Sequence, residues 1–262
     1  MKEKGQMKFA KLGRMSRCRV GVGLVLGYLC LGLLACRSTP PLSESPSGIP
    51  AAYASRPQLQ GKAVVEMEVQ TAEGVGKVIL AIHGEAAPLT GGQFVDLVQR
   101  GFYNGLTFHR VEKDPQPFVV QGGDPRGDGT GGATEPGSNR LRTIPLEIQL
   151  RGEPYPRYNT LIQDPAALSK LLLPHRLGAV AMARSSPLDS ASSQFYITLS
   201  ALPILDGRYA VFGYVTEGME WVERIQVGDV IRSARVLEGA DLLRVPGSQP
   251  ERADQMEDPG SL

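Results

Sequence analysis

The stretch 106–132, which reads LTFHRVEKDPQPFVVQGGDPRGDGTGG, contains the residues best suited to chemistry. Arg110 ends a short apolar strand, and Phe118 and Gln121 follow on the next strand of the sequence. A permanently charged guanidinium beside an aromatic ring and an amide can bind a peptide group and polarise it without a metal or a covalent nucleophile. These residues therefore indicate a site that binds a peptide through hydrogen bonds.

This stretch resembles the cyclophilin-type peptidyl-prolyl cis-trans isomerases, whose motifs are FHR, then F-x-x-Q-G-G-D, then G-T-G-G. All three motifs are present in family order, at 108–110, 118–124 and 129–132. Later blocks resemble the remaining pocket strands of the family, and they read AVAMAR at 179–184, SSQFYITLS at 192–200 and LDGRYAVFGYVTEGM at 205–219. The resemblance covers residues 60–238 and is strongest to a bacterial, cyanobacterial-like member that is exported as a lipoprotein.

The resemblance implies a role for each matching residue. Arg110 corresponds to the catalytic arginine, Gln121 to the amide that contacts the substrate backbone, and Phe118 to the aromatic wall of the proline pocket. Substrate contacts are further implied for Val119, Ala183, Arg184, Gln194, Tyr196, Leu205 and Tyr209. In strand 194–199, the period of two places Gln194, Tyr196 and Thr198 on one face. The family needs no cofactor.

Three positions depart from the family pattern and affect the expected pocket. Tyr196 replaces the usual phenylalanine, Tyr209 replaces a histidine, and Ile204 stands where a tryptophan favours cyclosporin binding. We therefore expect weak cyclosporin binding. The spacer 111–117 is also longer than usual in the family. His109 is interpreted as a structural strand residue, because alternation turns it away from the face of Arg110.

The first residues are typical of a targeting signal. Residues 1–35 contain seven Lys or Arg and one acidic residue, and the apolar run 20–35 is short for a membrane span. The segment ends LLAC, which resembles a lipobox, so Cys36 is predicted to be lipidated and to hold the protein on the extracytoplasmic face of a membrane. The alternative is an uncleaved anchor. The start codon stays open between Met1, Met7 and Met15.

Composition narrows the function further. The whole chain has a net charge of +1, and the chain without residues 1–35 has −5, which does not favour nucleic acid as a partner. All three cysteines lie within residues 1–36, so the exported domain has no disulfide. The histidines are scattered along the sequence and show no spacing typical of a metal site; they are His83, His109 and His175.

Short alternating strands predict a mainly β fold. The expected strands outside 106–132 are 63–69, 76–82, 145–148, 178–183, 194–199, 209–215 and 230–236. Helices are predicted at 88–101 and 219–226, and together with the resemblance this implies a closed eight-stranded antiparallel barrel capped by two helices. The predicted parts are a signal peptide at 1–35, a flexible tether at 36–60, the isomerase domain at 61–238 and a flexible tail at 239–262. An inserted loop, 149–174, contains a helical turn at 165–172.

Two functions from different classes remain open. The first is a monomeric prolyl isomerase that assists the folding of proline-containing, exported or membrane-associated polypeptides. The second is a lipid-tethered module that binds proline peptides or assists assembly, with incidental turnover. A serine hydrolase using Ser185, Ser192 or Ser193 is not favoured, because no motif places a histidine to activate these residues.

Overall fold

The computed structural model describes residues 48–246. The predicted signal peptide, Cys36, the first half of the predicted tether and the end of the predicted tail therefore lie outside the described residues. Within the described part of the chain, no helix has the length and apolar character needed to cross a membrane.

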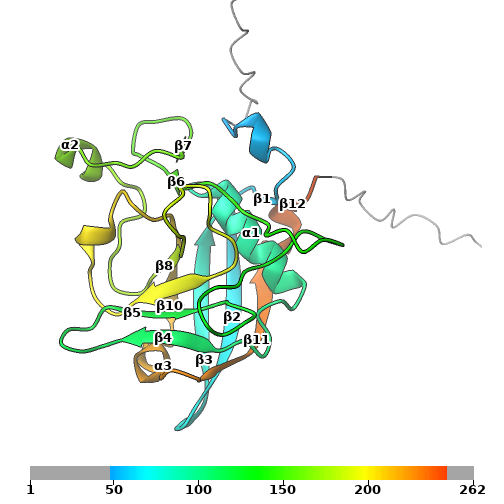
Figure 1. Ribbon diagram of the computed structural model, residues 1–262. Helices are drawn as coiled ribbons and strands as arrows, with labels where there is room; N and C mark the ends of the chain where they lie inside the picture. Colours follow the sequence, from blue (N-terminus) through cyan, green and yellow to red (C-terminus); the bar gives the residue numbers. More distant parts are fainter. Residues whose placement is uncertain (1–47, 247–262) are drawn as a thin grey trace, which may run out of the picture. The chain divides into compact units, whose positions relative to one another are not determined.

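Eight strands form one antiparallel sheet, which curls strongly around a hydrophobic core (Figure 1). Their order across the sheet is β11-β2-β3-β10-β8-β9-β5-β4. Their bounds are β2 Lys62–Thr71, β3 Gly74–His83, β4 Phe108–Glu112, β5 Val119–Gly122, β8 Ala179–Met182, β9 Phe195–Thr198, β10 Val211–Glu217 and β11 Val230–Glu238. The predicted mainly β fold with eight antiparallel strands is confirmed.

The two edge strands of this sheet, β4 and β11, meet over a short distance. Thr107 and Val230 form an isolated antiparallel bridge, and the amide of Phe108 donates to the carbonyl of Asp229. The rest of the two edges carries no ladder, so the sheet is a strongly curled half-barrel joined at one point instead of the uniformly closed barrel that was expected. Gly228 and Gly105 also take part in this backbone junction.

Two helices contribute side chains to the core of the barrel, α1 Pro88–Gln99 and α3 Met219–Arg224. Phe94 and Leu97 of α1 and Val222 of α3 belong to the same buried cluster as the inward side chains of the strands. Figure 1 shows α1 and α3 at opposite ends of the sheet. The predicted helices are thus confirmed, and each ends two residues before its predicted limit.

Short elements complete the domain beyond the predicted limits of 61 and 238. Strand β1 Gln58–Leu59 pairs with β12 Leu243–Arg244, and Leu59 is fully buried. The predicted tether and tail are therefore too long at their inner ends, because the apolar Leu59 packs into the core. The 3-10 helices are η1 Ala51–Tyr53, η2 Pro203–Leu205 and η3 Ala240–Leu242.

The predicted insertion forms a substructure of its own. Strand β6 Glu147–Ile148 pairs with β7 Arg157–Tyr158 in a separate two-stranded sheet, so the predicted strand 145–148 does not join the barrel. The predicted helical turn is present as α2 Pro165–Leu168. A third apolar cluster lies beneath the insertion and contains Leu146, Ile148, Leu150, Ile162, Leu171 and Ala210.

Glu147 connects this insertion to α1. Its side chain is buried and accepts hydrogen bonds from the amides of Leu89 (3.1 Å) and Thr90 (2.8 Å), and from the Thr90 hydroxyl (2.8 Å). Ala87 at the N-cap has no side chain able to accept these donors, so Glu147 caps the helix from a distant part of the sequence. Burial raises the pKa of the Glu147 carboxyl, against the effect of the amide donors.

We expect Glu147→Gln to destabilise the domain, because the amide replaces one accepting oxygen with a donor that faces other donors. Leaving a buried donor unpaired costs about 1–3 kcal/mol. Urea unfolding followed by circular dichroism measures the change. Glu153→Gln is the matched control, since Glu153 belongs to the same insertion but pairs with Arg157 at the surface, where such changes stay within about 0.5 kcal/mol. Equal stability of the two variants would contradict the capping role.

Candidate functional site

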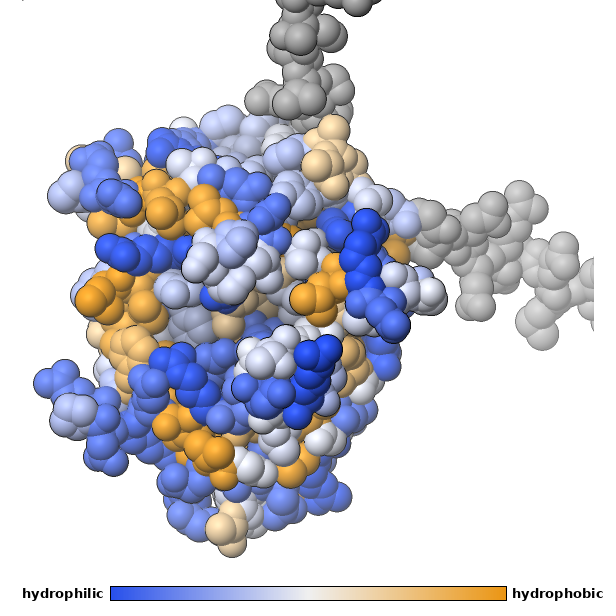
Figure 2. Space-filling model, viewed as in Figure 1, coloured by the Kyte–Doolittle hydropathy of each residue, from blue (hydrophilic) through white to orange (hydrophobic). Residues whose placement is uncertain are grey.

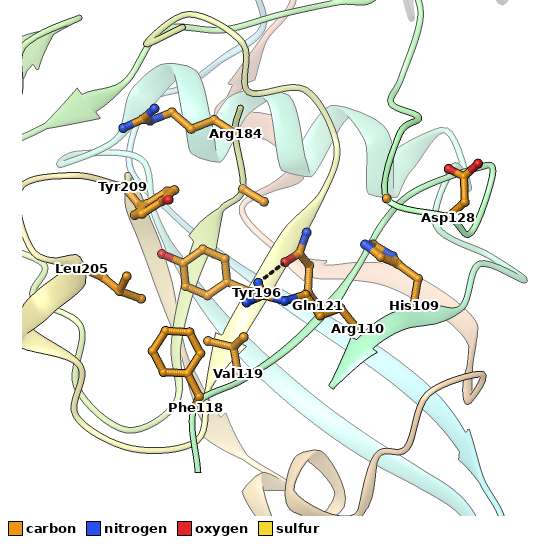
Figure 3. Close-up of a pocket in the computed structure, with 12 residues that line it drawn as sticks. His109, Arg110, Phe118, Val119, Gln121, Asp128, Arg184, Tyr196, Leu205 and Tyr209 are labelled. Carbon is orange, nitrogen blue, oxygen red and sulfur yellow. Dashed lines mark hydrogen bonds between the residues drawn. The ribbon is translucent and has the colours of Figure 1, made fainter. Parts of the chain in front are cut away.

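A cavity of about 660 Å³ opens on the outer face of the sheet, where β4, β5 and β9 lie side by side (Figure 3). It is lined by His109, Arg110, Phe118, Val119, Gln121, Asp128, Gly129, Ala183, Arg184, Tyr196, Leu205 and Tyr209. All the predicted site residues of the folded domain except Gln194 are therefore brought together in one place. Gln194 lines an adjoining groove of about 360 Å³, which shares Gln121, Gly129, Ala183 and Arg184 with the cavity.

Strand register explains why these residues meet. Arg110 lies opposite Gln121, Gln121 lies opposite Tyr196, and Tyr196 lies opposite Ala181. Residues directly opposite in antiparallel strands point to the same face of a sheet. The next residues along the strands, such as Val120 and Ile197, point into the barrel core.

A chain of hydrogen bonds fixes the polar side of the cavity. Nη1 of Arg110 donates to Oε1 of Gln121 (2.9 Å), and Nε2 of Gln121 donates to Oε1 of Gln194 (2.9 Å). Nε2 of Gln194 then donates to the carbonyls of Gly129 (3.0 Å) and Gly131 (2.8 Å). The guanidinium is thus oriented through two amides that are themselves held by the glycine-rich segment.

Glu112 is a second partner of Arg110 that the motif comparison did not identify. Its Oε1 accepts from Nε of Arg110 (2.8 Å) and lies 2.7 Å from Nη2. The two side chains are about half exposed, 45% for Arg110 and 46% for Glu112. Positions i and i+2 of a strand share a face, so this pair could have been found from the sequence FHRVE. The carboxylate holds the guanidinium at the rim of the cavity.

The glycine-rich segment is organised by the buried carboxylate of Asp124. It accepts from the amides of Arg126 (2.8 Å), Asp128 (3.2 Å) and Gly129 (2.6 Å). A Cβ atom at Gly131 would lie 2.1 Å from Oδ1 of Asp124, so only glycine fits beside this carboxylate. The resulting tight turn places the two carbonyls that hold Gln194.

The other side of the cavity is apolar and rests on a cluster separate from the barrel core. Val119 and Tyr196 belong to it and are buried, with Phe118, Leu205 and Tyr209 packed against them. Tyr196 and Tyr209 make an edge-to-face contact, with centroids 5.9 Å apart. Burial raises the pKa of the Tyr196 hydroxyl well above its ordinary value, so the phenol stays neutral. The cavity thus combines one charged rim with an aromatic wall.

Arg184 forms part of the rim between the cavity and the adjoining groove. Its guanidinium donates to the carbonyls of Arg208 (2.8 Å from Nη2) and Ser185 (2.8 Å from Nη1), and lies 5.0 Å from the centroid of the Tyr209 ring. Because these donors are engaged by the protein, the side chain of Arg184 braces the wall formed by Tyr209.

The expectation for His109 is wrong, because this side chain lines the same cavity as Arg110. Phe108 pairs with Gly122 and Arg110 pairs with Gln121, so two steps on β4 correspond to one step on β5. Such a bulge breaks the alternation of side chains, and a bulge cannot be read from hydrophobic period alone. Figure 3 shows the imidazole of His109 on the side of the cavity where Asp128 lies.

No group of three or more His, Cys, Asp or Glu side chains in residues 48–246 is arranged to hold a metal ion. The hydroxyls of Ser192 and Ser193 donate to the carbonyls of Ala133 (3.1 Å) and Gly123 (2.8 Å). These serines therefore support the glycine-rich segment.

Comparisons with known proteins agree with this geometry. A family model described as cyclophilin type peptidyl-prolyl cis-trans isomerase matches residues 64–245. A Synechocystis protein named as a thylakoid lumen peptidyl-prolyl cis-trans isomerase is 41% identical over 212 residues, which cover 77% of this chain and 54% of that protein. Peptidyl-prolyl cis-trans isomerase B of Bacillus subtilis is 36% identical over 164 residues, which cover 63% of this chain and 93% of that protein.

A solved structure shows the same fold. The crystal structure of a cyclophilin type isomerase from Cryptosporidium parvum aligns with a TM-score of 0.50 and 25% identity, covering 68% of this chain and 98% of that one. The chain spans about half the length of the Synechocystis relative, 54%, so its similarity to that protein concerns the shared part.

Proposed function

The chain belongs to the cyclophilin-type peptidyl-prolyl cis-trans isomerases, and from this premise we propose that it accelerates rotation about X-Pro peptide bonds in polypeptide clients. The observation that carries the proposal is the position of Arg110. Its guanidinium is held by Gln121 and Glu112 at the rim of an apolar pocket formed by Phe118 and Tyr196. This pocket suits the ring of a proline, and the rim suits the amide beside it.

The proposed mechanism follows from the peptide bond. An X-Pro amide resists rotation with a barrier of about 18–20 kcal/mol, because the nitrogen lone pair is delocalised into the carbonyl. In the twisted state the lone pair is localised on the prolyl nitrogen, where Arg110 donates a hydrogen bond to it. The planar ground state offers no such acceptor, so this bond stabilises the transition state selectively. Phe118 and Tyr196 hold the ring, and Gln121 binds the substrate backbone while the preceding carbonyl turns.

Arg110→Ala is expected to lower kcat/KM by two orders of magnitude or more, equivalent to about 2.7 kcal/mol of transition-state stabilisation. Unfolding should change little, since Arg110 is half exposed. A protease-coupled assay on X-Pro peptides with varied X measures the rate. The matched control is Arg232→Ala, which removes an exposed arginine of β11 and should leave turnover unchanged.

The same variants distinguish catalysis from binding alone. A folded Arg110→Ala protein with wild-type turnover would refute the proposed mechanism. A wild-type protein that binds X-Pro peptides in calorimetry without accelerating their isomerisation would instead support the alternative, a peptide-binding or assembly module.

We also propose that the protein acts outside the cytoplasm, held to a membrane by a lipid on Cys36. Support comes from the basic then apolar sequence of residues 1–35 and its LLAC ending. The Synechocystis relative is named as a thylakoid lumen protein, which also favours an extracytoplasmic location. Its clients would then be exported or membrane-associated polypeptides.

Cys36→Ser is expected to release the protein from the membrane fraction or to leave the precursor uncleaved, because the thiol is the attachment point of the lipid. Fractionation of cells followed by mass spectrometry of the N-terminus provides the measurement. Cys30→Ser is the matched control, since Cys30 lies within the apolar run and precedes the predicted cleavage site. A wild-type protein that is soluble and carries no lipid would rule out the anchor.

Weak binding of cyclosporin is a further part of the proposal. Ile204 stands at the position where the indole of sensitive family members contacts the drug, and this residue is 71% exposed on η2. Figure 2 shows apolar side chains gathered at the left of this face, where η2 lies. An isoleucine has no N–H to donate, and it offers a smaller contact area than an indole.

Ile204→Trp is expected to tighten cyclosporin inhibition by roughly one to two orders of magnitude. A hydrogen bond contributes about 0.5–1.5 kcal/mol, the added apolar area contributes a similar amount at about 25 cal/mol per Å², and about 1.4 kcal/mol corresponds to tenfold. Titration of isomerase activity in both proteins gives the inhibition constants. Tight and equal inhibition of both would show that Ile204 does not occupy the indole position.

A further inference from the structure

His175 lies behind the aromatic wall of the pocket and connects two of its neighbours. Its ring is buried, with Nδ1 2.8 Å from Oδ1 of Asp206 and Nε2 2.9 Å from the hydroxyl of Tyr196. The Asp206 carboxylate also accepts from the backbone amide of His175 (2.8 Å), and the His175 carbonyl accepts from the amide of Leu202 (2.8 Å). Hydrogen bonds to the backbone and to the ring therefore hold His175 in place.

The chemistry of the three groups fixes the direction of the hydrogen bonds in the neutral imidazole. An ionised carboxylate only accepts, so Nδ1 of His175 carries the hydrogen and donates to Asp206. Nε2 is then an acceptor, and the Tyr196 hydroxyl donates to it. Burial keeps that hydroxyl neutral, since it raises the pKa of Tyr196. In this arrangement the phenol proton is directed at His175 and is not available to a ligand.

The orientation of the Tyr196 ring agrees with this assignment. Figure 3 shows the hydroxyl on the side of the ring away from Gln121. The rings of His175 and Tyr196 are nearly parallel, with an interplanar angle of 12°, and Tyr209 contacts Tyr196 edge-on at 84°. A phenol hydroxyl buried at this depth without a partner would lose its hydrogen bonds to water, so the ring would turn or water would enter the pocket.

We propose that His175, oriented by Asp206, is a positioning residue that holds the Tyr196 hydroxyl out of the pocket and leaves an apolar ring face for the proline of the substrate. This inference rests on the proposed function of the same pocket. The tyrosine in the wall and the histidine behind it form a matched pair, because the extra hydroxyl needs an acceptor that a phenylalanine would not need.

The position of His175 also gives the insertion a role at the site. His175 follows Pro174 directly. Leu173, which precedes Pro174, packs in the same apolar cluster as Val119 and Tyr196. The carbonyl of Pro174 accepts from the hydroxyl of Tyr214 (2.9 Å). The end of the segment 149–174 is thus fastened against the pocket wall, where it delivers the imidazole.

The test compares His175→Leu, which removes the acceptor, with His175→Gln, whose amide can reach the Tyr196 hydroxyl. We expect His175→Leu to raise KM for X-Pro peptides about tenfold, while kcat stays within about twofold. The pocket grips the ring equally in the ground and transition states, so its loss affects KM and leaves kcat unchanged. His175→Gln should recover most of the affinity.

A double variant supplies the second part of the test. Tyr196→Phe removes the hydroxyl that needs a partner, so adding His175→Leu to Tyr196→Phe should change KM by less than about threefold relative to Tyr196→Phe alone, a non-additive result. Thermal unfolding of every variant checks the fold. If His175→Leu does not fold, His175→Asn replaces it, since its shorter amide cannot reach Tyr196.

Two results would overturn the inference. One is an unchanged KM in a folded His175→Leu protein. The other is a KM of the double variant that exceeds the KM of Tyr196→Phe by the same factor of about ten as His175→Leu adds to wild type. Calorimetric binding of an X-Pro peptide separates this outcome from failure of the proposed function. A wild-type protein that binds the peptide without turnover refutes the isomerase proposal, and the affinities of the variants still decide the role of His175.

Discussion

The site depends on the in-register pairing of β4, β5 and β9. Antiparallel pairing puts Arg110, Gln121 and Tyr196 on one face, with Gln121 on the strand between the other two. A guanidinium at the rim and a phenol in the wall can then act on the same ligand without any loop closing over it. A shift of one residue in the pairing of β5 with β9 would turn Tyr196 into the barrel core and Ile197 toward the ligand. The buried barrel core therefore fixes the register on which the chemistry relies.

At the rim of the cavity, Arg110 is held by two acceptors and still keeps N–H donors for a substrate. Glu112 and Gln121 both accept hydrogen bonds from Arg110. These bonds already restrict the long side chain of Arg110, so it loses less conformational entropy when a substrate binds. The guanidinium carries five N–H donors, so donors remain for a substrate. Because both charged groups are about half exposed, water screens their attraction and the pair serves mainly to orient the arginine.

The mainly β fold class follows from local patterns, and the cavity residues were implied by the resemblance of the motifs to the family. Alternation located the strands, and the motifs around Arg110, Phe118 and Gln121 located the pocket. Residues that act through tertiary contacts were not found this way. Glu147 caps α1 from 57 residues away, and His175 meets Tyr196 across 21 residues. The bulge at His109 and the pairing of β1 with β12 likewise depend on how the sheet curls, which hydrophobic period does not determine.

The segment 149–174 was predicted as an inserted surface loop. The residues on either side of it attach it to α1 and to the wall of the pocket. Glu147 precedes it and accepts the first amides of α1, whose Phe94 lies in the barrel core. His175 follows it, and Nε2 of its ring lies 2.9 Å from the hydroxyl of Tyr196 in the pocket wall. Between them, Leu150 and Ile162 pack in a cluster under the segment, so the insertion is folded and attached at both ends. The folded insertion is therefore connected through Glu147 to α1 and through His175 to the wall of the pocket, in a closely packed domain where a change at one attachment is felt by its neighbours.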